Sequence, residues 1–336
     1  MTTVQDSEIR SRLIGLGRLS RVVRVLTVAV YSAVVCWIVC CIGSAYWGWP
    51  YDVGDSEQSG IFIAAAFIAL LVLHYLQLYG LTTLKERETE IMRKALRSRF
   101  PDAVYSANGS IPRTTLEKSS FFELPAAEDD AVAFTVYGSI AFRGGERSAT
   151  IYDIGVTTGG FTDVWSRVPV AGTLLMIYRT IIRPMFGVPV ESSRHSFRVM
   201  FGIHTGAAEC SGTIVVLPDN PDSKTSGLAE SAKVCVIRNG ARPVTIDDAE
   251  FGNLFAVYAD DEIEARKILS PAVVQRIKAL RSSFGRDLLV SFSEDRVCYA
   301  VPFEGGFLRP SRKSLEDERL FEQIFREIES GRRFIL

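Results

Sequence analysis

The sequence predicts an α+β fold, with an N-terminal two-helix transmembrane hairpin followed by a cytoplasmic β-rich domain and a few packed helices. Two uncharged apolar runs, residues 25–49 and 61–84, come first. A helix rises about 1.5 Å per residue and a bilayer core is about 30 Å thick, so each run is long enough to span it. Segments with strand-like patterns then precede two helical patterns near the C-terminus, an order typical of α+β proteins.

The charges that flank the two runs predict their orientation. Basic residues precede the first run and follow the second, whereas residues 50–60 contain carboxylates and no Lys or Arg. Positive flanks stay in the cytoplasm, so both termini are expected inside, with a short outer loop at 50–60. The first run is too long for a cleaved signal peptide, and a second span follows at once. The residues expected at the membrane interface are Arg21, Arg24, Trp47, Trp49, Lys85 and Arg87.

Four parts of the chain follow from this organisation. Residues 82–100 are charged and helix-prone, and Phe100-Pro101 is expected to end the helix. A stretch rich in Ser, Asn, Gly and Pro, residues 106–113, then separates this stalk from the body. The parts are a basic cytoplasmic N-terminus (1–24), the transmembrane hairpin (25–84), a helical stalk (85–105) and the cytoplasmic α+β domain (106–336).

Strand patterns dominate the first part of the body. Residues 131–142 and 149–156 predict a β-hairpin joined by a turn at 143–146. The sequence also predicts strands at 196–203, 213–217 and 233–237, and a second hairpin of 288–292 and 297–301 joined by 293–296.

Two helices are expected near the C-terminus. Ser270-Pro271 has the pattern of an N-cap followed by proline at the first helical position, and apolar residues then recur at helical spacing to Phe284. A second stripe runs from Leu320 to Ile328.

The segment 168–190 is apolar, is interrupted by prolines and carries Arg179 and Arg183. Only 168–178 is free of charge, which is too short for a third span. The segment is expected to cover the sheet as a core helix. The alternative is a helix in the membrane surface, with Arg179 and Arg183 at the headgroups.

The densest charged cluster is Asp260-Asp261-Glu262-Ile263-Glu264. Asp260, Asp261 and Glu264 are the candidates for metal binding or acid–base catalysis, with His195 or His204 as possible additional ligands. The alternative is structural, because Asp261 and Glu264 have the spacing of a helix N-cap and its third residue. We favour capping, and we predict no metal site and no cofactor.

Residues 249–266, followed by Ile268-Leu269-Ser270-Pro271, resemble the signature of the bacterial membrane family called domain of unknown function 3137, sometimes labelled galanin-like. Segments 197–202, 212–219 and 288–302 match its pattern in the same order, and the resemblance runs from the anchor to about Ser314. It implies a two-span bacterial inner-membrane protein with a cytoplasmic α+β domain. The family has no established activity, so the resemblance assigns no role to any residue.

Two classes of function remain. The expected one is a membrane-anchored, non-enzymatic interaction, scaffold or sensing module at the cytoplasmic face of the inner membrane. The alternative is a membrane-tethered metal-dependent hydrolase that uses the acidic cluster at 260–264. The expected partners are the lipid bilayer and a membrane or cytoplasmic protein, and a homo-oligomer stays open. A net charge of −1 gives no basic footprint for nucleic acid.

Overall fold

The structure is a computed structural model that describes single helical residues and short helical stretches between 15 and 43, then residues 56–107, 109–122, 132–144, 147–158, 197–222, 225–303, 307–308 and 318–334. It divides into two compact units, Met1–Ile91 with Phe161–Ser193, and Met92–Gly160 with Arg194–Leu336. Several residues singled out in the sequence lie outside the described residues: Arg24, Trp47, Trp49, Arg179, Arg183 and His195.

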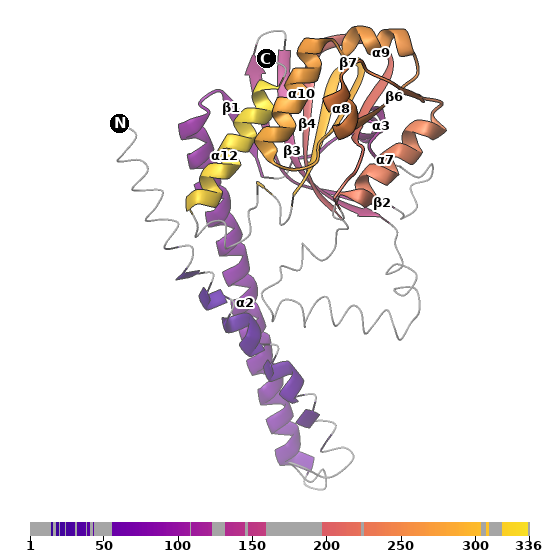
Figure 1. Cartoon of the computed structure of the whole chain (residues 1–336). Coiled ribbons are helices and arrows are strands. Elements are labelled where there is room, and N and C mark those ends of the chain that lie inside the picture. Colours follow the sequence, from indigo (N-terminus) through magenta and orange to yellow (C-terminus); the bar gives the residue numbers. More distant parts are fainter. Residues whose placement is uncertain are drawn as a thin grey trace. The chain divides into compact units, whose positions relative to one another are not determined.

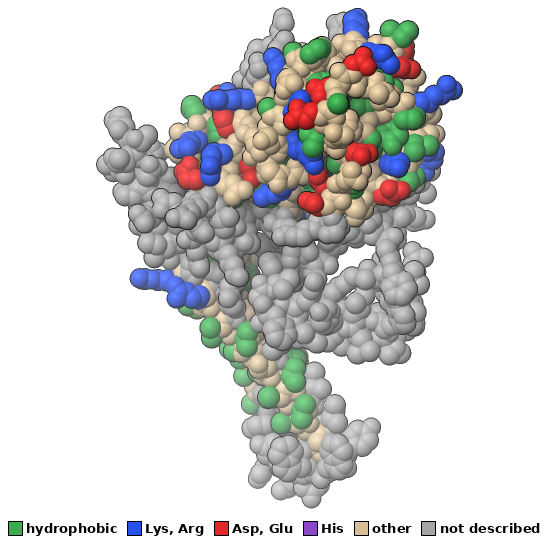
Figure 2. Space-filling view, viewed as in Figure 1, with side chains coloured by type: hydrophobic (Ala, Val, Ile, Leu, Met, Phe, Trp, Pro, Cys, Tyr) green, Lys and Arg blue, Asp and Glu red, His purple; other side chains and the backbone are tan. Residues whose placement is uncertain are grey.

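The second apolar run forms part of a long helix, α2 (Ser56–Arg99). Within the described residues, Phe67–Arg99 is the one stretch of helix long and apolar enough to cross a membrane, with a mean hydropathy of 1.6 in its most apolar window. Figure 2 shows hydrophobic side chains on the surface of this helix. The helix continues through the predicted stalk and ends before Phe100, whose helical conformation is disfavoured by the following proline. Residues 85–99 of the predicted stalk (85–105) are therefore helical, whereas its last residues are not, because strand β1 begins at Ala103. The membrane crossing stays a prediction.

The first apolar run also contributes helical residues to this unit, and they pack against α2 in antiparallel fashion. Gln77 Nε2 donates a hydrogen bond to Thr27 Oγ1 at 3.4 Å. The rings of Trp37 and Phe67 lie 6.3 Å apart between centroids. Residues later in the first helix contact residues earlier in α2, so the two helices run antiparallel, as in a helical hairpin.

The second unit is built on an antiparallel sheet that has seven strands among the described residues (Figure 1). Their order is β1-β2-β3-β4-β6-β5, and β7 pairs with β4. The strands are β1 (Ala103–Ser106), β2 (Val132–Gly144), β3 (Arg147–Thr158), β4 (Phe197–Pro218), β5 (Arg242–Val244), β6 (Phe255–Ala259) and β7 (Leu289–Pro302). The α+β class and the β2–β3 hairpin are therefore confirmed.

The strand predictions for β4 and β7 need correction. Segments 196–203 and 213–217 are both part of the single strand β4. The predicted hairpin at 288–301 is also one strand, because β7 pairs with β4 on both sides of residues 293–296. These polar residues lie opposite an irregularity in β4 between Thr205 and Thr213, and Glu294 has a positive φ of 53°. The polar stretch therefore marks a bend in two paired strands and not a turn.

The predicted strand at 233–237 is wrong, because these residues belong to helix α7 (Ser226–Arg238). The run contains β-branched residues, which favour strands in isolation. However, α7 buries Leu228, Ala229, Ala232, Cys235 and Val236, which recur at helical spacing. Tertiary packing outweighs local preference here.

Among the described residues, this unit has five further helices: α3 (Arg113–Lys118), α8 (Ala249–Leu254), α9 (Glu262–Ile268), α10 (Pro271–Phe284) and α12 (Glu318–Arg333). The two predicted C-terminal helices are confirmed as α10 and α12. Ser270 occupies the N-cap position of α10 without a side-chain cap bond, and Gly285 ends the helix in the left-handed region.

The sheet is covered on both faces. On one face, Phe121, Phe122 and Phe201 form edge-to-face ring pairs beside buried residues of α3 and α7. On the other face, Tyr299 contacts the rings of Phe284 and Phe334. Strand β7 alternates between the two layers, with Cys298 and Ala300 in the first core and Tyr299 in the second.

Candidate functional site

The acidic cluster lies at the start of α9 and faces the irregular part of β4. Asp261 is the N-cap of α9, and its Oδ1 accepts hydrogen bonds from the backbone N–H groups of Ile263 at 2.8 Å and Glu264 at 3.4 Å. Asp260 Oδ2 accepts from the backbone N–H of Thr213 at 2.9 Å. The capping interpretation of Asp261 is thus confirmed.

Glu264 does not complete a capping box but reaches across to β4. Its carboxylate accepts hydrogen bonds from the Ser211 backbone N–H and hydroxyl, both at 2.7 Å, and from the Gly212 N–H at 3.2 Å. The hydrogen bonds from Ser211 lower the pKa of Glu264, since they favour the charged carboxylate. Asp260 and Glu264 therefore fasten α9 to the bend in β4.

His204 lies in a different environment and does not join this cluster. It is buried in β4, and its Nε2 lies 3.0 Å from the carbonyl oxygen of Gly331 in α12. Because a carbonyl only accepts, Nε2 carries the proton and donates. Burial lowers the pKa of His204 to about 4, so it is neutral at physiological pH. In the part of the chain that the structure describes, no three His, Cys, Asp or Glu side chains are arranged to hold a metal ion.

A buried ion pair that the sequence did not reveal joins β3 to β4. Arg198 Nη2 donates to both carboxylate oxygens of Asp153 at 2.8 Å, and the guanidinium stacks 3.8 Å above the centroid of the Tyr137 ring. Asp153 also accepts from the backbone N–H groups of Phe307 and Leu308, at 3.1 and 3.0 Å. Arg198 Nε also donates to Asp153 Oδ1, at 3.2 Å. These four donors satisfy a carboxylate with no exposed surface, so the pair holds the segment after β7 against the sheet.

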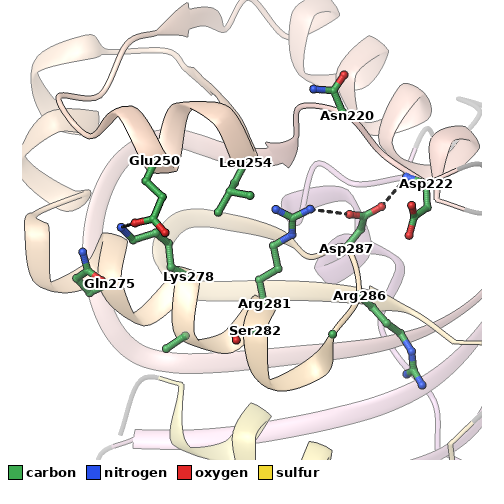
Figure 3. Close-up of a pocket in the computed structure, with 12 residues that line it drawn as sticks. Asn220, Asp222, Glu250, Leu254, Gln275, Lys278, Arg281, Ser282, Arg286 and Asp287 are labelled. Carbon is green, nitrogen blue, oxygen red and sulfur yellow. Dashed lines mark hydrogen bonds and ion pairs between the residues drawn. The ribbon is translucent and has the colours of Figure 1, made fainter.

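An open polar groove with a volume of ≈ 680 Å³ lies between α8 and α10 (Figure 3). Lys278 of α10 contacts Glu250 at 2.7 Å and Asp248 at 3.1 Å. Farther along, Arg281 contacts Asp287 at 3.2 Å, and Asp287 accepts from the backbone N–H of Asp222 at 2.8 Å. Figure 3 shows both pairs along one wall, with Leu254 between them and Arg286 pointing away.

The electrostatics of the groove are balanced. The hydrogen bond that Lys278 donates to Glu250 raises the pKa of Lys278, and the hydrogen bond that Asp248 accepts from the Phe251 N–H lowers the pKa of Asp248, so both groups are charged at neutral pH. Figure 2 likewise shows acidic and basic side chains interspersed on the viewed face of this unit. Such a groove suits a polar protein or peptide segment with charges of both signs better than an anion.

The sequence alone did not point to the groove. Lys278 and Arg281 lie on the polar face of a predicted amphipathic helix, where charged residues are normal. The groove depends on Asp222 and Glu250, which are brought beside α10 from two earlier segments.

The predicted interface residues are only partly described. Arg21 and Arg87 are exposed helical residues in the first unit, whereas Lys85 is helical but has no described side chain.

Residues 195–335 match the family model described as "Protein of unknown function (DUF3137)". The resemblance found in the sequence is thus confirmed over β4 to α12, beyond Ser314, and the match does not include the apolar runs or β1–β3. No curated protein and no solved structure matches the chain.

Proposed function

We propose that this chain, whose residues 195–335 match the family DUF3137 of unknown function, is a membrane-anchored, non-enzymatic interaction or sensing module at the cytoplasmic face of a bacterial inner membrane. Its hairpin would hold it in the bilayer, and its α+β body would bind a membrane or cytoplasmic protein.

The proposal that the protein is not an enzyme is supported by the backbone hydrogen bonds that the carboxylates of the acidic cluster already accept. Asp260, Asp261 and Glu264 each accept a backbone hydrogen bond of 2.9 Å or shorter. A carboxylate that binds a metal ion or abstracts a proton must present lone pairs to the ligand. Here the same oxygens fix the start of α9 and the bend in β4, which supports a structural role.

The membrane half is supported by the surface of α2. Phe67, Ile68, Leu71, Val72 and Tyr75 are large apolar residues, each at least 50% exposed. Soluble monomers rarely expose so continuous an apolar surface, because the removal of each apolar side chain from water lowers the free energy. A lipid environment removes that cost.

The groove between α8 and α10 is the surface that we assign to the protein partner. It is open, and Lys278, Arg281, Asp222 and Glu250 line it. Charges of both signs fix the register of a partner and exclude like-charged competitors.

Site-specific photocrosslinking in the native membrane tests this assignment. A photoreactive residue at Gln275 or Ser282, both groove residues, should give a discrete crosslinked product. The same residue at Lys233, an exposed position on α7, should not. Products from both surfaces alike, or from neither, would contradict the groove assignment.

The metal-dependent alternative predicts a different measurement. Metal analysis of the full-length protein purified from its native membrane should find no stoichiometric divalent ion. If an ion is present in the wild type and lost in Glu264→Gln, the hydrolase class replaces our proposal.

A further inference from the structure

The exposed surface of the hairpin changes from apolar to basic within a few turns on both of its helices. On α2, Tyr75 and Tyr79 are 69% and 64% exposed, and Arg87 follows as an exposed cation. On the helical residues of the first run, Val25 and Val22 are 69% and 63% exposed, and Arg21 and Arg18 precede them, both exposed. The change therefore occurs in the same direction along the hairpin on two separate segments.

Because the two helices are antiparallel, the change from apolar to basic residues occurs at the same height along the hairpin on both of them. Thr27 lies beside Gln77, and a Cβ on Gly80 would lie 3.0 Å from Val23 Cγ2. In an antiparallel pair, each step back along the first helix matches a step forward along α2. Continuing from Val23 and Gly80 places Arg21 beside Thr82 or Thr83, and Arg18 beside Lys85 or Glu86, next to Arg87.

The charge of the described side chains at this level is positive in sum. Arg18, Arg21 and Arg87 contribute three cations, and the exposed Glu86 offsets one of them. Arginine side chains are long enough to reach toward a membrane surface while their stems stay on apolar surface. Their guanidinium groups also match the geometry of a phosphate with two parallel hydrogen bonds.

We propose that Arg18, Arg21 and Arg87 form a basic collar that selects anionic phospholipids in the inner leaflet. The collar borders the exposed apolar band of Val22, Val25, Tyr75 and Tyr79, so a phospholipid places its phosphate on the arginines and its acyl chains along that band. A free phosphate or a soluble polyanion would use only the basic half of this surface. This inference rests on the proposed function, because the hairpin must be inserted for the collar to meet lipid.

The test uses the full-length protein reconstituted into phosphatidylcholine vesicles that contain a trace of spin-labelled phosphatidylglycerol or spin-labelled phosphatidylcholine. Electron paramagnetic resonance gives the motionally restricted fraction of each label. A preference of several-fold for phosphatidylglycerol is expected, because each basic residue near the surface contributes up to about 1 kcal/mol, or about fivefold. The preference should fall as salt is raised.

The variant Arg18→Gln, Arg21→Gln, Arg87→Gln should bring the preference close to one. The matched control removes the same number of charges farther along α2, as Arg93→Gln, Lys94→Gln, Arg97→Gln, all exposed in the structure. These positions begin about 9 Å beyond Arg87 along the helix, roughly one Debye length, so the control should keep most of the preference. An equal loss in both variants would replace the collar with a diffuse charge effect.

Two further measurements distinguish lipid binding from the binding of a free anion and from a failure of the hairpin to insert. Inorganic phosphate at millimolar concentration should leave the motionally restricted fraction of phosphatidylglycerol unchanged. If phosphate lowers that fraction, the arginines bind a free anion and not a lipid. Extraction of the vesicles with alkaline carbonate reports insertion. A protein that resists extraction but shows no lipid preference overturns the collar and leaves the anchor standing, whereas a protein that is extracted overturns both.

Discussion

Gly331 of α12 passes so close to Tyr299 of β7 that any side chain at position 331 would overlap the tyrosine hydroxyl. Gly202 of β4, the register partner of Tyr299, lies against the ring in the same way. The tyrosine is fully buried, and its hydroxyl has no hydrogen-bond partner among the described residues. Two glycines thus make room for one aromatic ring between the sheet and α12.

The first prediction separates the two glycines. Gly331→Ala should destabilise the protein by about 1–3 kcal/mol, as overpacking of a dense core does. Tyr299→Phe should partly rescue it, because the nearest remaining ring atom, Cζ, lies 3.0 Å from the added Cβ. Gly202→Ala should not be rescued, since its Cβ overlaps ring carbons that phenylalanine retains. Denaturant unfolding of the full-length single and double variants in a mild detergent measures the coupling.

The second prediction concerns the start of α9. Asp261→Ala should lower the free energy of unfolding by roughly 1 kcal/mol, whereas Asp261→Asn should be nearly neutral, because an amide oxygen also accepts from Ile263 and Glu264. Unfolding midpoints of the two variants give the comparison. If Asp261→Asn keeps its midpoint but loses the crosslinked product or a bound ion, the residue acts beyond capping.

The third prediction follows from His204. Burial lowers the pKa of this histidine in the folded protein to about 4, below the ordinary value of 6.5. The unfolded chain therefore binds more protons between these values, and stability should be full above pH 6.5 and fall as the pH drops toward 4. The contribution at stake is of the order of 3 kcal/mol.

His204→Gln isolates this effect, because the amide can still donate to Gly331 but does not titrate. The difference in unfolding free energy between wild type and variant should shrink or reverse from pH 7.5 to pH 5. A constant difference over that range would mean that His204 titrates normally in the folded protein.

The fourth prediction concerns the buried ion pair. Asp153→Ala should cost about 3–5 kcal/mol, because Arg198 loses its carboxylate partner inside the protein. The double replacement Asp153→Leu, Arg198→Met should lower the free energy of unfolding by less than the sum of the losses in the single variants Asp153→Leu and Arg198→Met. The same unfolding measurement applies. Additive effects would show that the pair is not coupled, which its 2.8 Å contacts argue against.

Features determined by neighbouring residues could be predicted from the sequence. The apolar run and charged continuation of α2, the β2–β3 hairpin, the proline start of α10 and the N-cap at Asp261 all depend on local patterns. The acidic cluster was found too, and its hydrogen bonds favour the structural interpretation.

Features that depend on distant contacts could not be predicted in this way. The segment at 233–237 has strand-like residues, but its burial in α7 follows from the sheet beneath it. Residues 293–296 look like a turn until the matching irregularity of β4 is placed opposite them. The ion pair joins Asp153 and Arg198, which lie far apart in the sequence, and the groove likewise combines Lys278 and Arg281 with distant residues. No local pattern in the sequence indicates either contact.

The pairing of β4 with β7 also sets an order of events during synthesis. Strand β4 ends at Pro218, but its longest partner is complete only at Pro302. A ribosome that adds about 5–20 residues per second needs several seconds to cover that distance. During that interval the β4 edge that pairs with β7 has no partner, and the surface of the sheet against which α10 and α12 pack is incomplete. The body therefore completes its sheet late, and a chain that ended before β7 would leave one edge of β4 unpaired and would lack Tyr299 between the sheet and α12.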